Sequence, residues 1–306
     1  MFSGRRMKVP APGRMVRGLH MQVAGRGSPV VVLEAGIAAS SVSWSLVQQR
    51  VAAFTTVLSY DRAGFGWSAP SSSPGTALDA AEDLARMLGE SGFSGPYVLA
   101  AHSFGGLIAR LFQQRYPERT AGLVLVDPVV RAEWRDAPGH KQRMLRRGVT
   151  LSRRGAMLAR LGVVGFALRL LTGGSQRVPR LLARVSAGKG AGVTDRLVGE
   201  VRKMPRELWP AIAQHWSQAR SFDAMADNLE NLPHSVTQLD ESRGLGDLPV
   251  IVLSAAKPIP EHLRDARLST RGEHILAPDS GHWIQLDAPE LVVDAIGRVV
   301  AQVRER

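Results

Sequence analysis

The ten residues YVLAAHSFGG, Tyr97 to Gly106, decide the fold. A strand-like apolar run ends in a His-Ser pair, and two glycines then open a helical pattern, so Ser103 lies on a sharp turn. A serine at such a turn presents its hydroxyl above a sheet only if the backbone is strained and the residues two positions away are small. Ala101 and Gly105 meet this requirement. The alternative is that Ser103 only caps the helix.

Apolar runs and helical patterns alternate on both sides of this turn. The runs are typical of buried strands, and the longer periodic stretches between them indicate helices. This alternation predicts an α/β fold with a mostly parallel central sheet flanked by helices. The expected strands lie within residues 29–36, 55–64, 96–103, 122–128, 248–255 and 273–278, and the expected helices within 78–92, 106–118 and 288–303.

The middle of the chain has a different pattern. From residue 129 to about 245 the strand signals disappear and Arg-rich helical stretches dominate, with breaks at 136–141, 171–176 and 186–192. We therefore predict three parts. Residues 18–128 form the first part of the α/β core, residues 129–245 an inserted helical cap, and residues 246–306 the second part of the core.

Composition excludes several classes of protein. A chain of 306 residues with 44% hydrophobic residues can bury a large core. It has no cysteine, which excludes disulfides, thiolate metal sites and a thiol nucleophile. The basic N-terminus is followed by no apolar segment of the secretory type, and the longest apolar stretch, residues 161–171, is interrupted by Arg169. We expect a cytoplasmic protein without a cofactor.

The net charge of +12 is concentrated in the middle of the chain. Residues 131–220 contain 19 Lys or Arg and five Asp or Glu. Such a block suits nucleic acid or an anionic membrane, but an arginine-rich composition alone also produces it. Nucleic acid is disfavoured because aromatic residues are only 6% and no binding motif is present. The amphipathic pattern at residues 153–168, with arginines beside its apolar face, is interpreted as a cap helix packed over the active-site mouth, and the alternative is peripheral contact with an anionic membrane through this basic face.

Three motifs in order resemble those of the α/β-hydrolase superfamily. AHSFG at residues 101–105 is similar to the G-x-S-x-G elbow, with alanine in place of the first glycine. SYDRAGFGWS at residues 59–68 resembles the D-x-x-G-x-G-x-S loop, and SGHWIQLDAPELV at residues 280–292 resembles the late loop that carries the catalytic histidine. The resemblance extends from about residue 18 to 303. It implies an α/β-hydrolase fold with an inserted cap.

The resemblance assigns roles to four residues. Ser103 is expected to be the nucleophile and His282 the base that activates it. Two backbone N–H groups are expected to form an oxyanion hole. One belongs to Phe104, directly after the nucleophile, and the other to Ile37, because Gly36 matches the glycine of the family's His-Gly motif.

The catalytic acid is the open assignment. In the commonest arrangement it follows the strand at 248–255, where the nearest carboxylates, Glu261 and Asp265, come several residues late. Asp127 ends an earlier strand, the place where some members of the family, haloalkane dehalogenases among them, carry the acid, and it keeps the chain order Ser, Asp, His. We predict Asp127, with a turn cap before Pro128 as its alternative role. Asp279 is a further candidate, expected on the surface.

These residues predict a serine hydrolase that acts on an ester, thioester or lactone through an acyl-enzyme. Dehalogenases and epoxide hydrolases of this fold use a carboxylate nucleophile, and Ser103 argues against both. The expected partner is a small ester-type substrate, apolar or acidic, and no nucleic acid. The alternative is a ligand- or lipid-binding protein of the same fold that does not hydrolyse anything.

Overall fold

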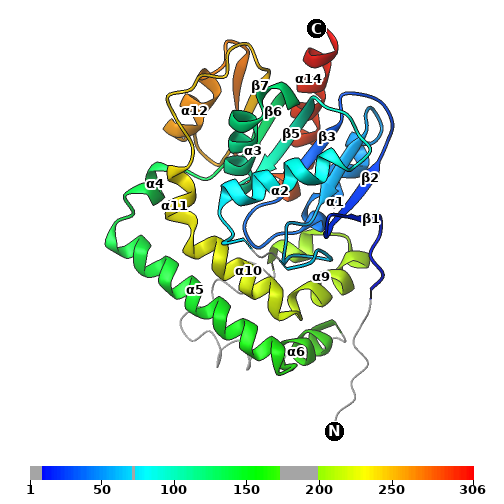
Figure 1. Cartoon of the computed structure of the whole chain (residues 1–306), viewed down its shortest axis with the longest axis vertical. Helices are drawn as coiled ribbons and strands as arrows, with labels where there is room; N and C mark the ends of the chain where they lie inside the picture. Colours follow the sequence, from blue (N-terminus) through cyan, green and yellow to red (C-terminus); the bar gives the residue numbers. More distant parts are fainter. Residues whose placement is uncertain (1–8, 71–72, 173–198) are drawn as a thin grey trace.

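The structure, a computed structural model, describes residues 9–70, 73–172 and 199–306 (Figure 1). Its centre is a sheet of eight strands in the order β1-β2-β4-β3-β5-β6-β7-β8. The first two strands pair antiparallel, and the six from β3 to β8 run parallel to one another. The strands are β1 (Arg14–Val16), β2 (Leu19–Ala24), β3 (Val31–Glu34), β4 (Val57–Tyr60), β5 (Tyr97–His102), β6 (Thr120–Val126), β7 (Val250–Ala255) and β8 (Gly272–Ala277).

The predicted mostly parallel sheet is confirmed. Four of its six parallel strands lie within the predicted stretches, whereas β6 begins two residues and β8 one residue before them. The two antiparallel strands were not predicted. β1 has only three residues, two of them exposed, and it exists because β2 pairs with it on one side and with β4 on the other. Pairing between strands, rather than an apolar run, therefore creates this edge of the sheet.

Helices cover both faces of the sheet (Figure 1). Because successive side chains of a strand point to opposite faces, Val98 and Ala100 pack with one set of helices and Leu99 and Ala101 with the other. The first set is α1 (Ser45–Val51) and α14 (Pro289–Arg304), and the second is α2 (Ala77–Gly89) and α3 (Phe104–Arg115). A sheet buried on both faces explains why its strands read as continuous apolar runs.

Shorter elements complete the two parts that carry the sheet. They are η1 (Ser41–Trp44), η2 (Pro117–Arg119), α12 (Pro260–Arg267) and α13 (Ile284–Asp287). Helix α12 lies after β7 and packs against β7 and β8. Helix α13 follows the loop after β8, so it lies between that loop and α14.

The chain between β6 and β7 is helical, and none of its described residues between 129 and 245 lies in a strand. Its long helix α5 packs along α10, and both lie at one end of the sheet together with α6 and α9 (Figure 1). The division of the chain into core and cap at residues 128 and 245 stays a prediction. The elements are α4 (Ala132–Arg135), α5 (Gly139–Arg160), α6 (Val163–Thr172), η4 (Arg206–Leu208), α9 (Trp209–Trp216), α10 (Ala219–Glu230) and α11 (Leu232–Thr237).

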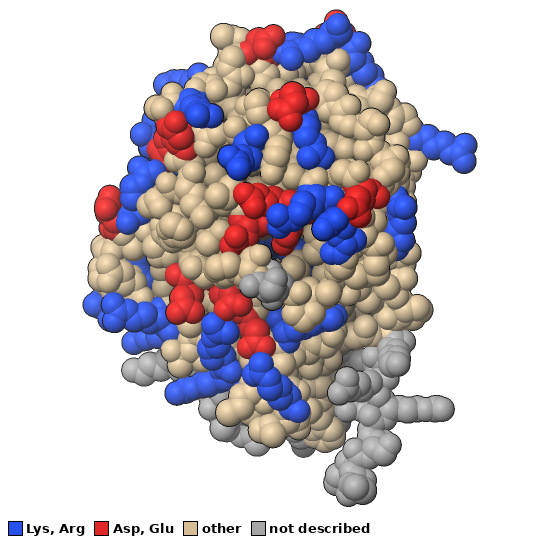
Figure 2. All heavy atoms as spheres, in the orientation of Figure 1, with Lys and Arg blue, Asp and Glu red and all other residues tan. Residues whose placement is uncertain are grey.

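Part of the positive charge of α5 is paired with acids of α10. Arg153 bonds Asp227 at 2.7 Å, and Arg160 bonds Asp223 at 2.6 Å. Figure 2 accordingly shows Lys and Arg side chains mixed with Asp and Glu on the face that carries these helices. The helix breaks expected at 171–176 and 186–192 lie wholly or mostly outside the described residues.

The amphipathic face expected across residues 153–168 is divided between two helices. Helix α5 ends at Arg160, and α6 begins at Val163. The side chains of Met157 and Leu161 are exposed. Membrane contact through this region stays the alternative prediction. Within the described ranges, no helix has the length and apolar character needed to cross a bilayer.

Candidate active site

Ser103 lies on the turn between β5 and α3, at the carboxyl end of the central parallel strands. Its backbone has φ 55° and ψ −119°, in the region where a residue with a side chain is strained. Three backbone bonds hold it there: its N–H donates to Val126, and its carbonyl accepts from Gly106 and Val129. Although Ser103 occupies the helix N-cap position, its hydroxyl makes no capping hydrogen bond. The hydroxyl is therefore left to face the loop after β8.

The small residues of this turn are required by close packing. A Cβ atom on Gly105 would lie 2.7 Å from the carbonyl oxygen of Ala35 and 2.8 Å from that of Glu34. A Cβ on Gly36 would lie 3.3 Å from the Ser103 Cβ. The backbone after β3 thus lies directly against the turn, and it can do so only because both positions are glycine.

His282 connects Ser103 to Asp127. Its Nε2 is 2.9 Å from the Ser103 Oγ, and its Nδ1 is 2.6 Å from Asp127 Oδ2. The His282 side chain is half exposed, whereas that of Asp127 is 12% exposed. The loop that carries His282 is held by the N–H of Gly281, which donates to Asp287 at 2.9 Å. The structure therefore brings together the three residues that the sequence singled out, in one hydrogen-bonded line.

Asp127 directly follows β6 and has φ 41°, so its side chain turns toward β7. There its Oδ1 accepts a hydrogen bond of 3.0 Å from the backbone N–H of Ala255. Burial works against ionisation of Asp127, but the hydrogen bonds from His282 and Ala255 outweigh it and lower the pKa of the carboxyl. Sequence analysis missed Ala255, because a backbone donor leaves no signal in residue type.

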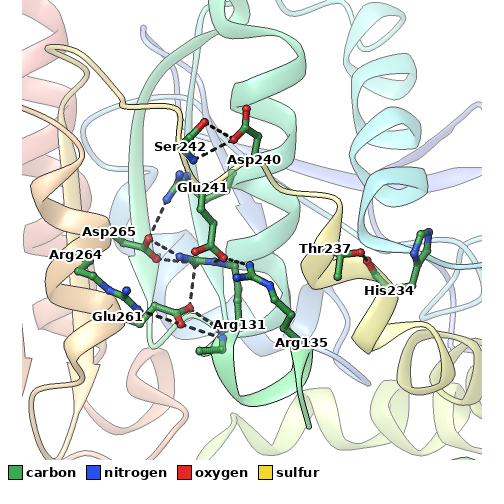
Figure 3. A network of polar contacts seen from close by, with 12 residues as sticks. Arg131, Arg135, His234, Thr237, Asp240, Glu241, Ser242, Glu261, Arg264 and Asp265 are labelled. Atoms are coloured by element: carbon green, nitrogen blue, oxygen red, sulfur yellow. Dashed lines mark hydrogen bonds and ion pairs between the residues drawn. The ribbon is translucent and has the colours of Figure 1, made fainter.

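Glu261 and Asp265, the alternatives for the acid, lie on α12 and bind arginines (Figure 3). Asp265 bonds Arg131 through both carboxylate oxygens at 2.7 and 2.8 Å and bonds Arg110 at 3.1 Å. Glu261 accepts the backbone N–H of Arg131 at 2.6 Å. Their carboxylates join the start of the helical segment to the second part of the core. Asp279 is exposed on the turn after β8, as expected.

Asp265→Asn should therefore reduce stability without stopping the reaction. Removing this carboxylate leaves the buried guanidinium groups of Arg131 and Arg110 short of a counter-charge, which costs about 3 kcal/mol of unfolding free energy. Urea denaturation measures that loss, and the folded variant should keep its kcat. Glu133→Gln, which removes an exposed ion pair with Lys141, is the matched control and should cost less than about 1 kcal/mol. A large fall in kcat with unchanged stability would contradict this assignment.

The two N–H groups expected to form the oxyanion hole belong to two segments that meet at Ser103. Phe104 is the first residue of α3, whose first N–H groups have no partner within the helix. Ile37 follows Gly36 in the loop packed against the turn. No acceptor for either N–H is found among the residues that the structure describes. Both groups are therefore free to donate to an oxygen that approaches Ser103.

His102 is a buried neighbour of the site. Its Nε2 lies 2.9 Å from the carbonyl oxygen of His282, so this nitrogen carries the proton, and its ring packs against those of His282 and Trp283. Burial, and then the nearby His282, lower the pKa of His102 to about 3. A neutral His102 therefore supports the carbonyl of the loop that carries His282.

Acid should destabilise this protein below pH 6.5. Burial lowers the pKa of His102 to about 3 and that of His215 to about 4. Between these values and 6.5 the unfolded chain binds a proton at each site and the native protein does not, so stability falls as pH falls, by up to about 1.4 kcal/mol per pH unit for each histidine. Urea denaturation from about pH 7 to pH 4 measures this slope. His102→Gln should make it shallower; an unchanged slope would contradict the assignment.

Among the residues described, no three His, Asp or Glu side chains converge in a way that could hold a metal ion. The groups that the site offers for chemistry are a hydroxyl, an imidazole, a carboxylate and two backbone N–H groups. A hydroxyl bonded to an imidazole, whose second nitrogen faces a carboxylate, can lose its proton to that imidazole. Two free N–H groups beside the hydroxyl can bind an oxygen that becomes negative. Together these groups can support nucleophilic attack by the hydroxyl on a carbonyl carbon.

Comparison with known proteins agrees with this geometry. The model of the alpha/beta hydrolase family matches residues 30–295. The chain belongs to the alpha/beta hydrolase family. An uncharacterised protein of Schizosaccharomyces pombe is 26% identical over 259 residues, which are 80% of this chain and 42% of that protein. The chain spans less than half of the length of the first curated relatives that it matches.

Solved structures of this hydrolase family have the same fold. An esterase of Thermogutta terrifontis superposes with a TM-score of 0.61 at 23% identity, over 93% of each chain. A Pseudomonas aeruginosa protein, provisionally described as an epoxide hydrolase, superposes with a TM-score of 0.70 at 18% identity, over 94% of this chain and 93% of that one. At these identities the likeness shows the fold alone.

Proposed function

We propose that this alpha/beta hydrolase is a serine hydrolase that cleaves a carboxylic ester-type bond, an ester, thioester or lactone, through an acyl-enzyme. The observation that carries the proposal is the line from Ser103 Oγ to His282 Nε2 at 2.9 Å and from His282 Nδ1 to Asp127 Oδ2 at 2.6 Å. Family membership and an esterase among proteins of the same fold support it.

In the proposed reaction, Ser103 Oγ attacks the acyl carbonyl carbon while its proton moves to His282 Nε2. Asp127 holds the imidazole by Nδ1 and stabilises the imidazolium that forms. The carbonyl oxygen, now negative, accepts hydrogen bonds from the N–H groups of Ile37 and Phe104. Collapse expels the alcohol or thiol, which takes the proton from His282 and leaves Ser103 acylated.

The second half of the reaction reuses the same groups. His282 Nε2 removes a proton from water, which attacks the acyl carbon, and the oxyanion again lies between the two N–H groups. Collapse returns the proton to Ser103 Oγ and releases the carboxylic acid. Ile37, in the loop packed against the turn of Ser103, has a partly buried apolar side chain, which favours an apolar acyl group.

Epoxide hydrolysis is the competing activity, because a protein provisionally described as an epoxide hydrolase has this fold. Ser103 argues against it. A serine ether formed by opening an epoxide ring has no carbonyl group for water to attack, whereas an acyl-serine does. The residue at the turn therefore favours ester-type substrates.

A panel of p-nitrophenyl esters of rising acyl chain length tests the proposal. We expect turnover with an initial burst of p-nitrophenol equal to the enzyme present when deacylation is slower than acylation. The chain length with the highest kcat/KM defines the acyl site. Binding of esters or fatty acids by the folded protein without any turnover would contradict the proposal and favour a ligand-binding protein of this fold.

A further inference from the structure

A buried cation lies behind the proposed oxyanion hole. Arg62 follows β4 and is 6% exposed. Its guanidinium donates to the Glu34 carboxylate at 2.5 Å and to the carbonyl oxygens of Ala35 at 2.5 Å and Gly36 at 2.6 Å. Arginine reaches these acceptors with two nitrogens held in one plane, a geometry that the single nitrogen of lysine does not reproduce.

The bond to Gly36 helps to orient the N–H of Ile37. The carbonyl of Gly36 and the N–H of Ile37 belong to one peptide unit, which is planar and trans, so they point in opposite directions. Holding the oxygen on Arg62, where it also accepts the N–H of Ala39 at 3.2 Å, therefore holds the N–H on the opposite side of the peptide. Ser103 lies close to this peptide, because a Cβ on Gly36 would be 3.3 Å from the Ser103 Cβ. A positive charge at the oxygen also polarises the peptide and strengthens its N–H as a donor.

Arg62 also contacts the residue that carries the second proposed donor. Its guanidinium carbon lies 5.9 Å from the ring centroid of Phe104 and 5.5 Å from that of Phe65. The hydroxyl of Tyr60 donates to the other oxygen of the Glu34 carboxylate. One buried group of residues thus fixes the loop after β3 and packs against the start of α3.

From these contacts we infer that Arg62 is a positioning residue for the reaction, which orients and polarises the Gly36–Ile37 peptide so that its N–H stabilises the oxyanion. The inference rests on the proposed function and assigns a role to a residue of the D-x-x-G-x-G-x-S loop that does not touch substrate.

The test compares Glu34→Gln with Glu34→Gln/Arg62→Met, so that neither protein contains an unpaired buried carboxylate. We expect the double variant to lose about 10- to 100-fold in kcat relative to Glu34→Gln, while KM changes less than about threefold. Affinity for an alkyl trifluoromethyl ketone, which forms an oxyanion on Ser103, should fall by the same factor as kcat/KM. A residue needed only for folding would lower the folded fraction and leave both values per folded molecule unchanged.

Arg62→Lys provides a second variant if the double variant does not fold. It keeps the charge beside Glu34 but loses the paired bonds to Ala35 and Gly36, and it should show a smaller fall in kcat in the same direction. Retention of full kcat and ketone affinity by either folded variant would overturn the inference. Failure of the unmodified protein to react with any ester or fluorophosphonate would instead refute the proposed function on which the inference rests.

Discussion

Ser103→Ala should lower ester hydrolysis by at least about 10⁴-fold and leave the fold intact. The Ser103 hydroxyl bonds His282 at 2.9 Å and makes no capping bond, so its removal takes away the proposed nucleophile and little else. Steady-state kinetics at high enzyme concentration, together with thermal unfolding, measure both effects.

Ser152→Ala is the matched control for this prediction. Ser152 is buried, and its hydroxyl donates to the carbonyl oxygen of Gly148 in its own helix α5, outside the proposed triad. This control should keep full activity. Hydrolysis by Ser103→Ala at more than about a hundredth of the unmodified rate would show that another group attacks the substrate.

Asp127→Asn should lower kcat by about 10⁴-fold with stability nearly unchanged. The backbone N–H of Ala255 donates to Asp127 Oδ1, so the amide oxygen of an asparagine must face Ala255 and its NH₂ must face His282 Nδ1. That NH₂ donates a hydrogen bond and selects the tautomer with the proton on Nε2. His282 then cannot accept the Ser103 proton.

Asp265→Asn gives the matched comparison, because it makes the same chemical change in a buried ion pair with Arg131. The two variants should separate cleanly: one loses kcat and the other loses stability. Full activity of Asp127→Asn would contradict the role proposed for this carboxylate.

The sequence predicts the features of the site that depend on local pattern. An apolar strand, a serine and small neighbours at 97–106 identify the turn, and the position of His282 after the last strand identifies the loop that reaches it. Because a parallel sheet brings the carboxyl ends of its strands to one edge, residues 179 positions apart lie 2.9 Å apart.

The choice among carboxylates depends on tertiary structure. Asp127, Glu261 and Asp265 all follow strands, and nothing in their spacing tells which one meets His282 and which meet Arg131. Residue type also does not reveal the backbone N–H of Ala255. The strands β1 and β2 were missed for a related reason, since β2 forms through pairing with β4, and β1 through pairing with β2, rather than through a long apolar run.

Reaction with a fluorophosphonate probe, followed by mass spectrometric mapping of the adduct, tests the central claim most directly. The probe modifies a serine hydroxyl only where a base and an oxyanion hole activate it. We expect one adduct, on Ser103, that is absent from Ser103→Ala and formed more slowly by Asp127→Asn. A folded protein that remains unlabelled at Ser103 would contradict the claim that Ser103, His282 and Asp127 form a working catalytic site.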